Sequence, residues 1–474
     1  MSYDMMHKIN NRQEDRPYQA PAAGEVQVRV RATGLCGSDL HYYNHGRNGD
    51  FALQHPMCLG HESAVSSSVQ SSNFFPPPTH KPLSMHTSLS RAIGTLKLLA
   101  FAHGQGEIVA VGSDVPSDLF AIGDRVAIEA GVYCKACTRC KEGRYNLCAS
   151  MRFASSAKTH PHLDGTLQRY LNWPYWGVHA LPSNVSLESA ALIEPLSVVL
   201  QGLRRSNLWA GESVLVLGAG AVGLLSCVTA KASGASFVAA VDINEGRLKF
   251  ARENRWADAT YLLPKAPPPA SQTNDSTADG DTRARRAAED SAIIDAAKHS
   301  AASMMDSLFP TTPKDQLRDR VRDRKREGFD AIFECSGVPS CVQMGIFAAR
   351  PGGRIVLIGM GTPIQIVPIG AAALREVDIL GVFRYAGTYP IAISMLSGDS
   401  LRAQGGGVSA DGRTTSKAAG LEVAEGKGAG QRMGGIENII SHRYSLEQAR
   451  EAFETLTKGK SDDGREATKV FIVH

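Results

Sequence analysis

The feature that most constrains the fold is a glycine-rich loop that stands between a strand pattern and a helix pattern. An apolar run at 214–217 leads into Gly218-Ala-Gly-Ala-Val-Gly223, a helical pattern covers 222–233, and a second apolar run at 237–241 ends at Asp242. Alternation of strand and helix indicates a parallel α/β sheet. In such a unit the three glycines permit a tight turn, close approach of the backbone to a pyrophosphate, and close helix packing. The sequence therefore predicts a dinucleotide-binding domain.

Specific residues of this unit are expected to contact the cofactor, and the start of the helix is expected to attract its phosphates. From the loop these residues are Gly218, Gly220, Val222 and Gly223. Asp242, about 20 residues further on, can accept hydrogen bonds from ribose hydroxyls and repels a 2′-phosphate, which favours NAD over NADP. Arg247 lies close enough in sequence to leave NADP open. The alternative interpretation is a turn of small residues that serves packing alone.

Four cysteines form a second compact motif with the spacing C-x2-C-x2-C-x7-C. They are Cys134, Cys137, Cys140 and Cys148. Four thiolates this close in sequence can surround one tetrahedral zinc ion and leave no open coordination position, so we expect a structural rather than a catalytic zinc. Unligated thiols or an iron–sulfur cluster are the alternatives. The motif has no paired second half and no histidine ligand, which disfavours a nucleic-acid zinc finger.

Composition and charge exclude several classes of partner. The 51 basic and 47 acidic residues are spread along the chain and give a formal net charge of +4, so we expect no nucleic-acid partner. The least polar stretch, 213–230, contains the glycine-rich loop and is better explained as strand, turn and helix than as a membrane span. The N-terminal residues lack an apolar signal region. We therefore expect no membrane partner and a cytoplasmic location.

Several further motifs occur in a distinctive order along the chain. They are Gly34-Leu-Cys-Gly-Ser-Asp-Leu-His-Tyr42, Gly60-His-Glu62, Gly123-Asp-Arg-Val126, the four cysteines, Glu194-Pro-Leu-Ser-Val198, the Gly218 loop and Phe383-Arg-Tyr385. Together they resemble the zinc-dependent medium-chain alcohol dehydrogenases. The Glu194 and Phe383 motifs resemble the branch that contains sorbitol, xylitol and arabinitol dehydrogenases, and 242–250 is most similar to fungal pentitol members.

The resemblance implies a fold of the α/β class with two domains. A GroES-like, β-rich catalytic domain would comprise 1–196 and 382–474, and an NAD-binding Rossmann domain with a doubly wound parallel sheet would comprise 197–381. The active site would lie between them. Relatives are commonly tetramers, so the resemblance also implies a homo-oligomer.

The resemblance also implies roles for several residues that would not indicate a function on their own. A lone cysteine, for example, is most often a small buried hydrophobe. Cys36, His61 and Glu62 would hold a catalytic zinc, with Glu194 as an alternate or water-mediated ligand. Ser38 and His41 would pass the hydroxyl proton outward. The residues that would line a polyol site are Tyr42, Arg384 and Tyr385. For Arg384 the alternative is a surface salt bridge.

The implied function is NAD- and zinc-dependent interconversion of a sugar alcohol, such as xylitol, sorbitol or arabinitol, and its ketose. One alternative is a dehydrogenase of another secondary alcohol, such as threonine or a diol. A second alternative is a zinc- and nucleotide-binding protein that an insertion has deprived of activity.

Three segments do not fit the family pattern. Residues 65–105 follow Glu62 closely, and their removal restores an uninterrupted motif, so our hypothesis is a translated retained intron or a gene-model error. Residues 264–325 are predicted to be a low-complexity insertion that contains a solvated helix. Residues 401–435 are predicted to be a flexible surface loop.

Overall fold

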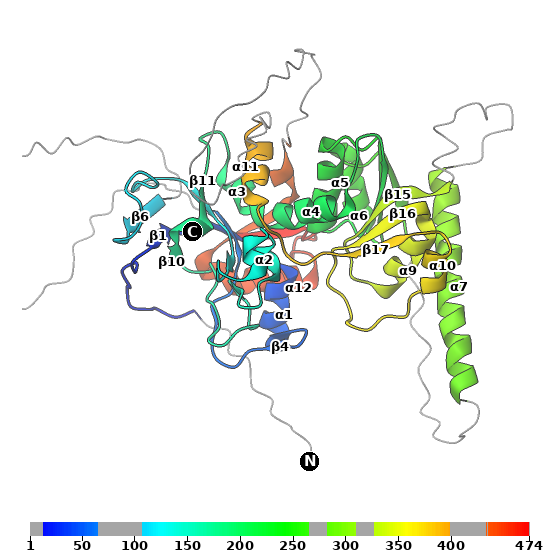
Figure 1. The fold of residues 1–474 in the computed structure, drawn as a ribbon, viewed down its shortest axis with the longest axis horizontal. Coiled ribbons are helices and arrows are strands. Elements are labelled where there is room, and N and C mark those ends of the chain that lie inside the picture. Colours follow the sequence, from blue (N-terminus) through cyan, green and yellow to red (C-terminus); the bar gives the residue numbers. More distant parts are fainter. Residues whose placement is uncertain are drawn as a thin grey trace, which may run out of the picture.

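The computed structural model describes residues 13–64, 107–264, 282–309, 327–398, 433 and 435–473. The segment 65–105 and nearly all of the predicted loop 401–435 lie outside the described residues. A β-rich half and an α/β half lie side by side (Figure 1). Within the described ranges, no helix combines the length and the apolar character needed to cross a bilayer.

The α/β half is built on one parallel sheet with the strand order β14-β13-β12-β15-β16-β17. The strands are β12 (Ser213–Leu217), β13 (Phe237–Asp242), β14 (Ala259–Leu262), β15 (Phe329–Glu334), β16 (Ala349–Leu357) and β17 (Asp378–Gly381). The order reverses between β12 and β15, which is where ligands bind in doubly wound sheets. The predicted α/β fold class is therefore confirmed, and the Gly218 loop lies at this switch point.

Alternate residues of the central strand are buried on opposite faces of the sheet. Val214 and Val216 belong to the apolar cluster on one face, and Leu215 and Leu217 belong to the cluster on the other. The first face is covered by α4 (Ile193–Ser206), α5 (Ala221–Ala232) and α6 (Glu245–Glu253), and the second by α7 (Thr282–Leu308), α9 (Pro339–Ala348) and α10 (Ile369–Ala373). A parallel sheet buried on both faces explains why these strands are continuous apolar runs.

Helix α7 lies at the outer edge of this half, beside α9 (Figure 1). The sequence predicted a solvated helix within 264–325, and a helix of 27 residues is present. It is not solvated all round, because Ala297, Ala301 and Met304 are buried as one stripe against the sheet layer. Two of the three are alanines, which are only weakly apolar, so the helical pattern of apolar residues in this sequence is weak.

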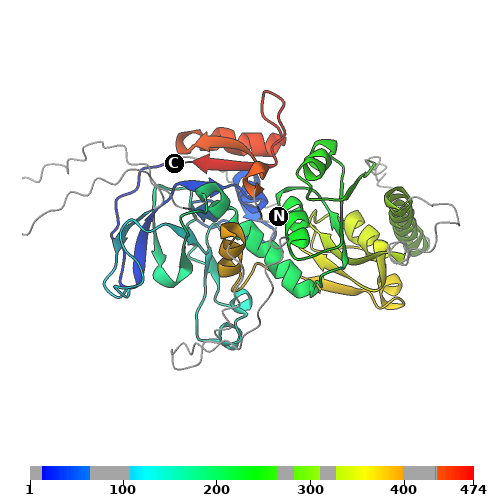
Figure 2. The same cartoon turned by 90° about the horizontal axis from the view of Figure 1, so that it is seen from above.

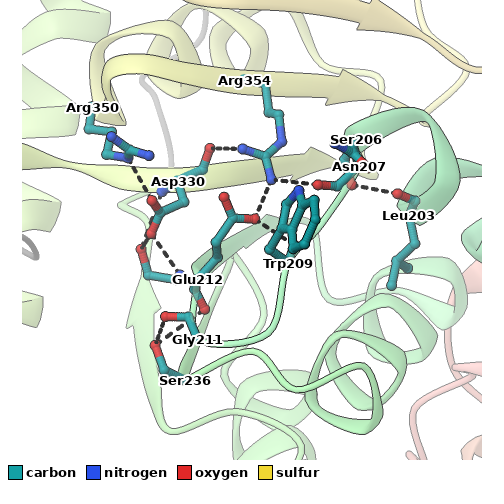
Figure 3. Close-up of polar contacts among 11 residues, drawn as sticks. Leu203, Ser206, Asn207, Trp209, Gly211, Glu212, Ser236, Asp330, Arg350 and Arg354 are labelled. Carbon is teal, nitrogen blue, oxygen red and sulfur yellow. Dashed lines mark hydrogen bonds and ion pairs between the residues drawn. The ribbon is translucent and has the colours of Figure 1, made fainter.

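The amino ends of the central strands are tied by a polar network (Figure 3). Asp330 on β15 accepts hydrogen bonds from the Ser213 backbone nitrogen at 2.8 Å and the Ser213 Oγ at 2.7 Å. It also accepts one from Arg350 Nε at 2.6 Å. Arg354 on β16 pairs with Glu212, just before β12. These bonds hold β12, β15 and β16 together at the edge opposite the Gly218 loop.

The β-rich half contains two larger antiparallel or mixed sheets. The first has the order β10-β1-β6 and the second β11-β7-β5-β2-β19-β18. Their strands are β1 (Glu25–Arg29), β2 (Ala32–Gly34), β5 (Glu62–Ala64), β6 (Glu107–Val111), β7 (Val126–Ile128), β10 (Tyr170–Pro174), β11 (Val178–Ala180), β18 (Ile440–Ser445) and β19 (Lys469–Val473). Strand β19 pairs with β2, so segments from both ends of the sequence complete one sheet (Figure 2).

The remaining elements of the β-rich half are short. They are α1 (Gly37–His45), α2 (Thr138–Lys141), α3 (Leu187–Ala191), α11 (Tyr389–Ser397), α12 (Ala449–Lys458), β3 (Arg47–Asn48), β4 (Phe51–Ala52), β8 (Gly131–Val132), β9 (Arg152–Phe153) and 3-10 turns at Tyr145–Leu147, Tyr175–Gly177, Ile436–Ile439 and Leu446–Gln448. Helix α4 connects the halves, because it packs on β5 of one and on β16 of the other (Figure 2).

Candidate active site

Strand register brings three predicted metal ligands together. Strand β2 pairs with β5 so that Gly34 lies opposite Glu62, and the chain then turns into α1 at Cys36. As a result the ligand atoms of Cys36, His61 and Glu62 all lie within 4.8 Å of one another. A Cβ atom at Gly34 would overlap the Glu62 carboxylate, so this pairing requires glycine. A thiolate, an imidazole and a carboxylate are ligands that zinc prefers, and three protein ligands leave a position open.

A buried aspartate orients the histidine of this group. Asp39 Oδ1 lies 3.3 Å from His61 Nδ1 and accepts hydrogen bonds from the Gly60 backbone nitrogen at 3.0 Å and from Ser155 Oγ at 2.5 Å. Burial by itself would lower the pKa of His61, but the Asp39 charge outweighs it and raises the pKa well above its usual value. A carboxylate that faces one ring nitrogen leaves the other directed at the metal, as at many metal-binding histidines.

A buried lysine completes the group, and the sequence analysis missed it. Lys469 Nζ contacts Glu62 Oε2 and donates a hydrogen bond to the Leu35 carbonyl at 3.0 Å. Burial would lower the pKa of Lys469, but the charges of Glu62 and Cys36 raise it, so the ammonium stays protonated. The available signal was a lysine that opens the apolar strand Lys469–Val473, a position where a charge needs a partner.

Glu194 lies beside the three ligand residues on the first turn of α4. The described group of ligand atoms within 4.8 Å of one another comprises Cys36, His61 and Glu62, and Glu194 is not part of it. Burial, together with the nearby charge of Glu62, raises the pKa of Glu194 to about 7 although the His61 charge opposes this shift. Its carboxyl group can therefore change protonation state near neutral pH.

Two of the predicted substrate residues present unpaired polar atoms beside this group. The Arg384 guanidinium carbon lies 4.0 Å from the centre of the Phe153 ring, which in turn lies 5.6 Å from the His61 ring. Arg384 Nη1 and the Tyr385 hydroxyl are buried, and neither makes a hydrogen bond within 3.5 Å, although the Tyr385 hydroxyl lies close enough to Glu194 and Tyr389 to lower their pKa values against the larger raising effect of burial. Within the described ranges no carboxylate lies within 4.0 Å of Arg384, so the surface salt bridge considered for it is not formed there. Unpaired buried donors are costly and point to a polar ligand.

The third predicted substrate residue, Tyr42, is buried on α1, and its hydroxyl accepts a hydrogen bond from the Ala157 backbone nitrogen at 2.9 Å. The predicted relay residues lie on the same helix. Ser38 is half-buried and His41 is exposed, and residues three apart share a helix face. The two residues therefore lie on one face of α1, Ser38 half-buried two residues after Cys36 and His41 exposed one turn further on.

The four-cysteine motif forms a compact second group. The Sγ atoms are separated by 3.5 Å for Cys137 and Cys140, 3.6 Å for Cys134 and Cys148, and 3.9 Å for Cys134 and Cys140. Sulfurs at the corners of a tetrahedron with zinc–sulfur bonds of about 2.3 Å are about 3.8 Å apart, so the donors fit zinc. Backbone hydrogen bonds from Cys137 and Ala136 lower the pKa of Cys134 to about 6, which favours the thiolate that binds metal.

The cysteine motif also positions the segment that carries Arg384. Asn146 Nδ2 donates a hydrogen bond to the Phe383 carbonyl at 2.8 Å. The Tyr145 hydroxyl accepts one from the Gly387 backbone nitrogen at 2.5 Å and donates one to Glu129 Oε1 at 2.6 Å. A metal in the cysteine group would therefore also stabilise the wall of the candidate substrate site.

The glycine-rich loop has the geometry expected of a phosphate-binding turn. Gly218 has a φ of 94°, in the left-handed region, and a Cβ at Gly223 would overlap the Gly218 carbonyl oxygen. No atom lies within 4 Å of the position that a Cβ at Gly220 would occupy, so the backbone is open there. Helix α5 begins directly after Gly220, and Val222 lies half-buried in its first turn. The loop therefore fits a pyrophosphate.

The predicted ribose-binding acid lies next to this loop, at the end of β13. Asp242 accepts hydrogen bonds from the Ala219 backbone nitrogen at 2.6 Å and from the Asn244 backbone nitrogen at 2.8 Å. Arg247 Nη1 is 3.9 Å from Asp242 Oδ2. The two residues that bear on NAD or NADP preference thus lie side by side, and the aspartate partly neutralises the arginine.

Comparison with known proteins agrees with this geometry. The alcohol dehydrogenase GroES-like domain model matches residues 22–67 and 98–183, and the zinc-binding dehydrogenase model matches 292–398. Sorbitol dehydrogenase of Gallus gallus is 31% identical over 96% of this chain and 93% of the relative. D-xylulose reductase A of Aspergillus oryzae is 34% identical over 83% of this chain and 84% of the relative.

The fold also matches solved structures. Galactitol-1-phosphate dehydrogenase from Escherichia coli superposes with a TM-score of 0.63 at 21% identity, over 98% of this chain and 96% of that structure. The GroES-like match resumes after a break at 68–97, which lies within the segment that the sequence marked as foreign. With its two domain types, its two groups of metal-binding side chains and relatives that span its length, the chain belongs to the zinc-binding alcohol dehydrogenase family.

Proposed function

We propose that the protein oxidises a secondary hydroxyl of a sugar alcohol to the ketose with NAD, and catalyses the reverse reaction. The observation that carries this proposal is the placement of unpaired Arg384 and Tyr385 donors beside the Cys36, His61 and Glu62 group. A substrate with several hydroxyls can satisfy such donors while one hydroxyl reaches the metal. The relatives named sorbitol dehydrogenase and D-xylulose reductase support the same substrate class.

In this proposal Cys36, His61 and Glu62 hold the catalytic zinc, and Glu194, which lies beside them, is an alternate or water-mediated ligand. The four cysteines hold a structural zinc. Bound by these residues, zinc would supply a Lewis acid that lowers the pKa of the substrate hydroxyl, and NAD would supply the hydride acceptor. Asp39 keeps the His61 ring oriented, and Lys469 keeps the Glu62 carboxylate in place.

The protein's own groups then bind the substrate and move its proton. Arg384, Tyr385 and Tyr42 orient the hydroxyl groups that do not react. Glu194 lies beside the metal-ligand group, and its pKa of about 7 lets it hold or release a proton near neutral pH. Ser38 and His41 lead to solvent and relay the proton outward.

The Gly218 loop and α5 hold the dinucleotide, with Gly218, Gly220, Val222 and Gly223 against its phosphates. Asp242 carries the preference for NAD, because its carboxylate accepts from the ribose hydroxyls and repels a 2′-phosphate. The proposed domains are 1–196 with 382–474, and 197–381. The second range contains the whole parallel sheet, and the division at 196 falls inside α4.

Purified protein should be assayed for NADH formation on xylitol, sorbitol, arabinitol, threonine and 2,3-butanediol, together with its zinc content. We expect turnover of at least one sugar alcohol and about two zinc ions per chain. Turnover of threonine or the diol alone would contradict the substrate class. One zinc ion per chain and no turnover would support a non-catalytic binding protein instead.

We also propose a homo-oligomer, and the resemblance of the sequence motifs to the family implies a tetramer. Edge strand β17 and the segments beside it expose large apolar side chains, with Ile364 91% and Leu374 90% exposed. Such a patch beside an unpaired sheet edge favours association with a second copy. Light scattering coupled to size-exclusion chromatography tests this, and a monomeric mass at micromolar concentration would contradict it.

We further propose a cytoplasmic location. All nine cysteines are free thiols in the structure, and the four-cysteine group must remain reduced to bind a metal. Imaging of the tagged protein in its source cells tests this, and a secreted or organellar signal would contradict it.

A further inference from the structure

Two cations next to the candidate active site lie against the same aromatic ring. Lys158 Nζ is 5.5 Å from the centre of the Phe383 ring, and the guanidinium carbon of Arg384 is 4.9 Å from it. The Phe383 side chain is 43% exposed, so this ring forms part of an accessible wall. Like charges held on one ring repel each other unless an anion lies between or beside them.

Neither cation has an anionic partner in the part of the chain that the structure describes. No carboxylate there lies within 4.0 Å of Lys158 or Arg384, although most of the other described buried or half-buried arginines donate to carboxylates or carbonyls. Arg384 Nη1 is buried without any hydrogen bond. Burial and the Arg384 charge lower the pKa of Lys158, whereas the charge of Cys148 raises it, and the Glu194 charge acts on Arg384 without forming an ion pair. Neither cation is therefore joined to an anion by a direct ion pair, although Cys148 and Glu194 lie near enough to act on them.

A series of ring contacts connects the metal ligands first to Arg384 and then to Lys158. The Phe153 ring lies between His61 and Arg384, at 5.6 Å from the His61 ring and 4.0 Å from the guanidinium carbon. Arg384 also contacts the Phe383 ring, and Lys158 contacts that same ring, so Lys158 is the next cation in this series of ring contacts that starts at His61. Its neighbour Ala157 donates to the Tyr42 hydroxyl, which fixes this segment to the site wall. Moving outward from the metal ligands, a bound chain would meet Arg384 first and Lys158 next.

We propose that Lys158 and Arg384 bind an anionic group, a phosphate or a carboxylate, at the end of the polyol chain that is remote from the reacting carbon. The inference rests on the proposed function of this site and narrows its substrate class. A planar guanidinium and a mobile ammonium together suit an oxyanion, because the first offers paired donors and the second a point charge. A neutral hydroxyl could satisfy Nη1 but would leave both cations without a direct ion pair.

The proposal is tested by calorimetric binding to the zinc-loaded full chain in the presence of NADH, without need of turnover. The probes are sorbitol, sorbitol 6-phosphate and gluconate. We expect both anionic probes to bind at least tenfold more tightly than sorbitol at low salt, with the difference shrinking as ionic strength rises. The tighter of the two anions identifies the natural end group.

Two variants sharpen the result. Lys158→Met keeps the length of the side chain and removes its charge, and we expect it to reduce the preference for the phosphate over sorbitol to less than threefold. Lys458→Met, at an exposed lysine on α12 that pairs with Asp462, is the matched control and should retain the preference. Equal affinity for sorbitol and both anions would overturn the proposal.

A Lys158→Met variant that weakens NADH binding and leaves the probe preference intact would also overturn the proposal, because the cations would then serve the cofactor. Failure of the proposed function is seen separately. If the anionic probes bind tightly but no polyol or polyol phosphate is oxidised, the binding inference stands and the catalytic proposal falls.

Discussion

Lys469 Nζ lies against Glu62 Oε2, and both side chains are almost fully buried. One residue comes from the last strand of the chain and the other from a strand near its start, and β2 lies between them in the sheet. The ammonium holds the Glu62 carboxylate in a fixed orientation beside Cys36 and His61. Ion pairs behind metal ligands commonly set the affinity for the metal.

Replacing Lys469 by methionine should weaken zinc binding about 10- to 100-fold and lower kcat, because Glu62 loses its orienting partner. Breaking a buried ion pair also leaves an unpaired charge that costs about 3–5 kcal/mol of stability. Zinc titration and thermal unfolding measure the two effects. Adding Glu62→Gln should restore much of the stability without restoring zinc affinity. Lys249→Met, at an exposed lysine–glutamate pair, should change neither.

Loss of the structural metal should weaken substrate binding at the candidate active site. Cys148→Ser should reduce the zinc content from about two ions to about one per chain and raise KM for the polyol, because Tyr145 and Asn146 hold the segment that carries Arg384. Atomic absorption and steady-state kinetics measure these changes. Cys58→Ser is the control, since Cys58 belongs to neither group and burial raises the pKa of its thiol to about 12. An unchanged KM after loss of one zinc would contradict the link.

Local patterns predicted the elements whose structure depends on near neighbours in sequence. The strands expected at 214–217 and 237–241 are present with nearly those bounds, and the Gly218 loop was located because its glycines and the flanking patterns occupy one short stretch. Helix α7 was expected, but its buried stripe of small residues was not. Small side chains contribute little to an apolar period even where they are buried.

The site itself was predictable only where a motif named the residue. Asp39 and Lys469 were not predicted to act beside the metal ligands, because their positions depend on pairing between strands that are distant in sequence. The link from Asn146 to the Phe383 carbonyl is of the same kind. The period of apolar residues along the sequence indicates which side chains are buried. The register between strands determines which of those buried side chains come into contact.

The cofactor preference should follow the charge of Asp242. Asp242→Asn keeps the size of the side chain and removes the repulsion of a 2′-phosphate, while Arg247 remains 3.9 Å away to attract it. We expect the ratio of kcat/KM for NADP to that for NAD to rise about tenfold or more. The initial rates with each cofactor measure this ratio. Asp258→Asn, just before the start of the neighbouring strand β14, is the control, and an unchanged ratio in Asp242→Asn would assign the preference to other residues.

The polar network at the amino edge of the parallel sheet should make stability depend on pH. Burial would raise the pKa of Asp330, but hydrogen bonds from Ser213 and the Arg350 charge outweigh it, so the pKa lies below its usual value. A carboxyl group with a lowered folded pKa stabilises the protein above its unfolded pKa of about 3.9, and the effect is lost as pH falls through the folded pKa.

Asp330→Asn should therefore be about 1–3 kcal/mol less stable than the parent at pH 7, and the difference should shrink below about pH 4. Thermal unfolding across this range measures the difference between the two proteins. Asp462→Asn, on an exposed salt bridge, should match the parent throughout. A difference between Asp330→Asn and the parent that stays constant down to pH 2 would show that packing rather than ionisation is responsible.

Deletion of residues 65–105 should increase activity. Strand β5 ends at Ala64, two residues after Glu62; among the described residues it pairs with β2 and β7 and packs against α3 and α4. The next described strand, β6, starts at Glu107 and pairs with β1 in the other sheet. A long loop costs little in closure free energy, about 0.6 kcal/mol per doubling of length, so stability should change only modestly.

The catalytic effect of the deletion should be larger than its effect on stability, because an error of about 1 Å in a ligand-bearing turn can cost roughly a hundredfold in rate. We expect the shortened chain to show higher kcat/KM for a polyol and a zinc content closer to two per chain. Deletion within 401–432, also outside the described residues but distant in sequence from the ligands, is the control. Equal turnover and equal zinc content with and without 65–105 would contradict the prediction. They would mean that Lys469, the pairing of β5 with β2 and β7, and the packing of α3 and α4 on β5 suffice to position Glu62.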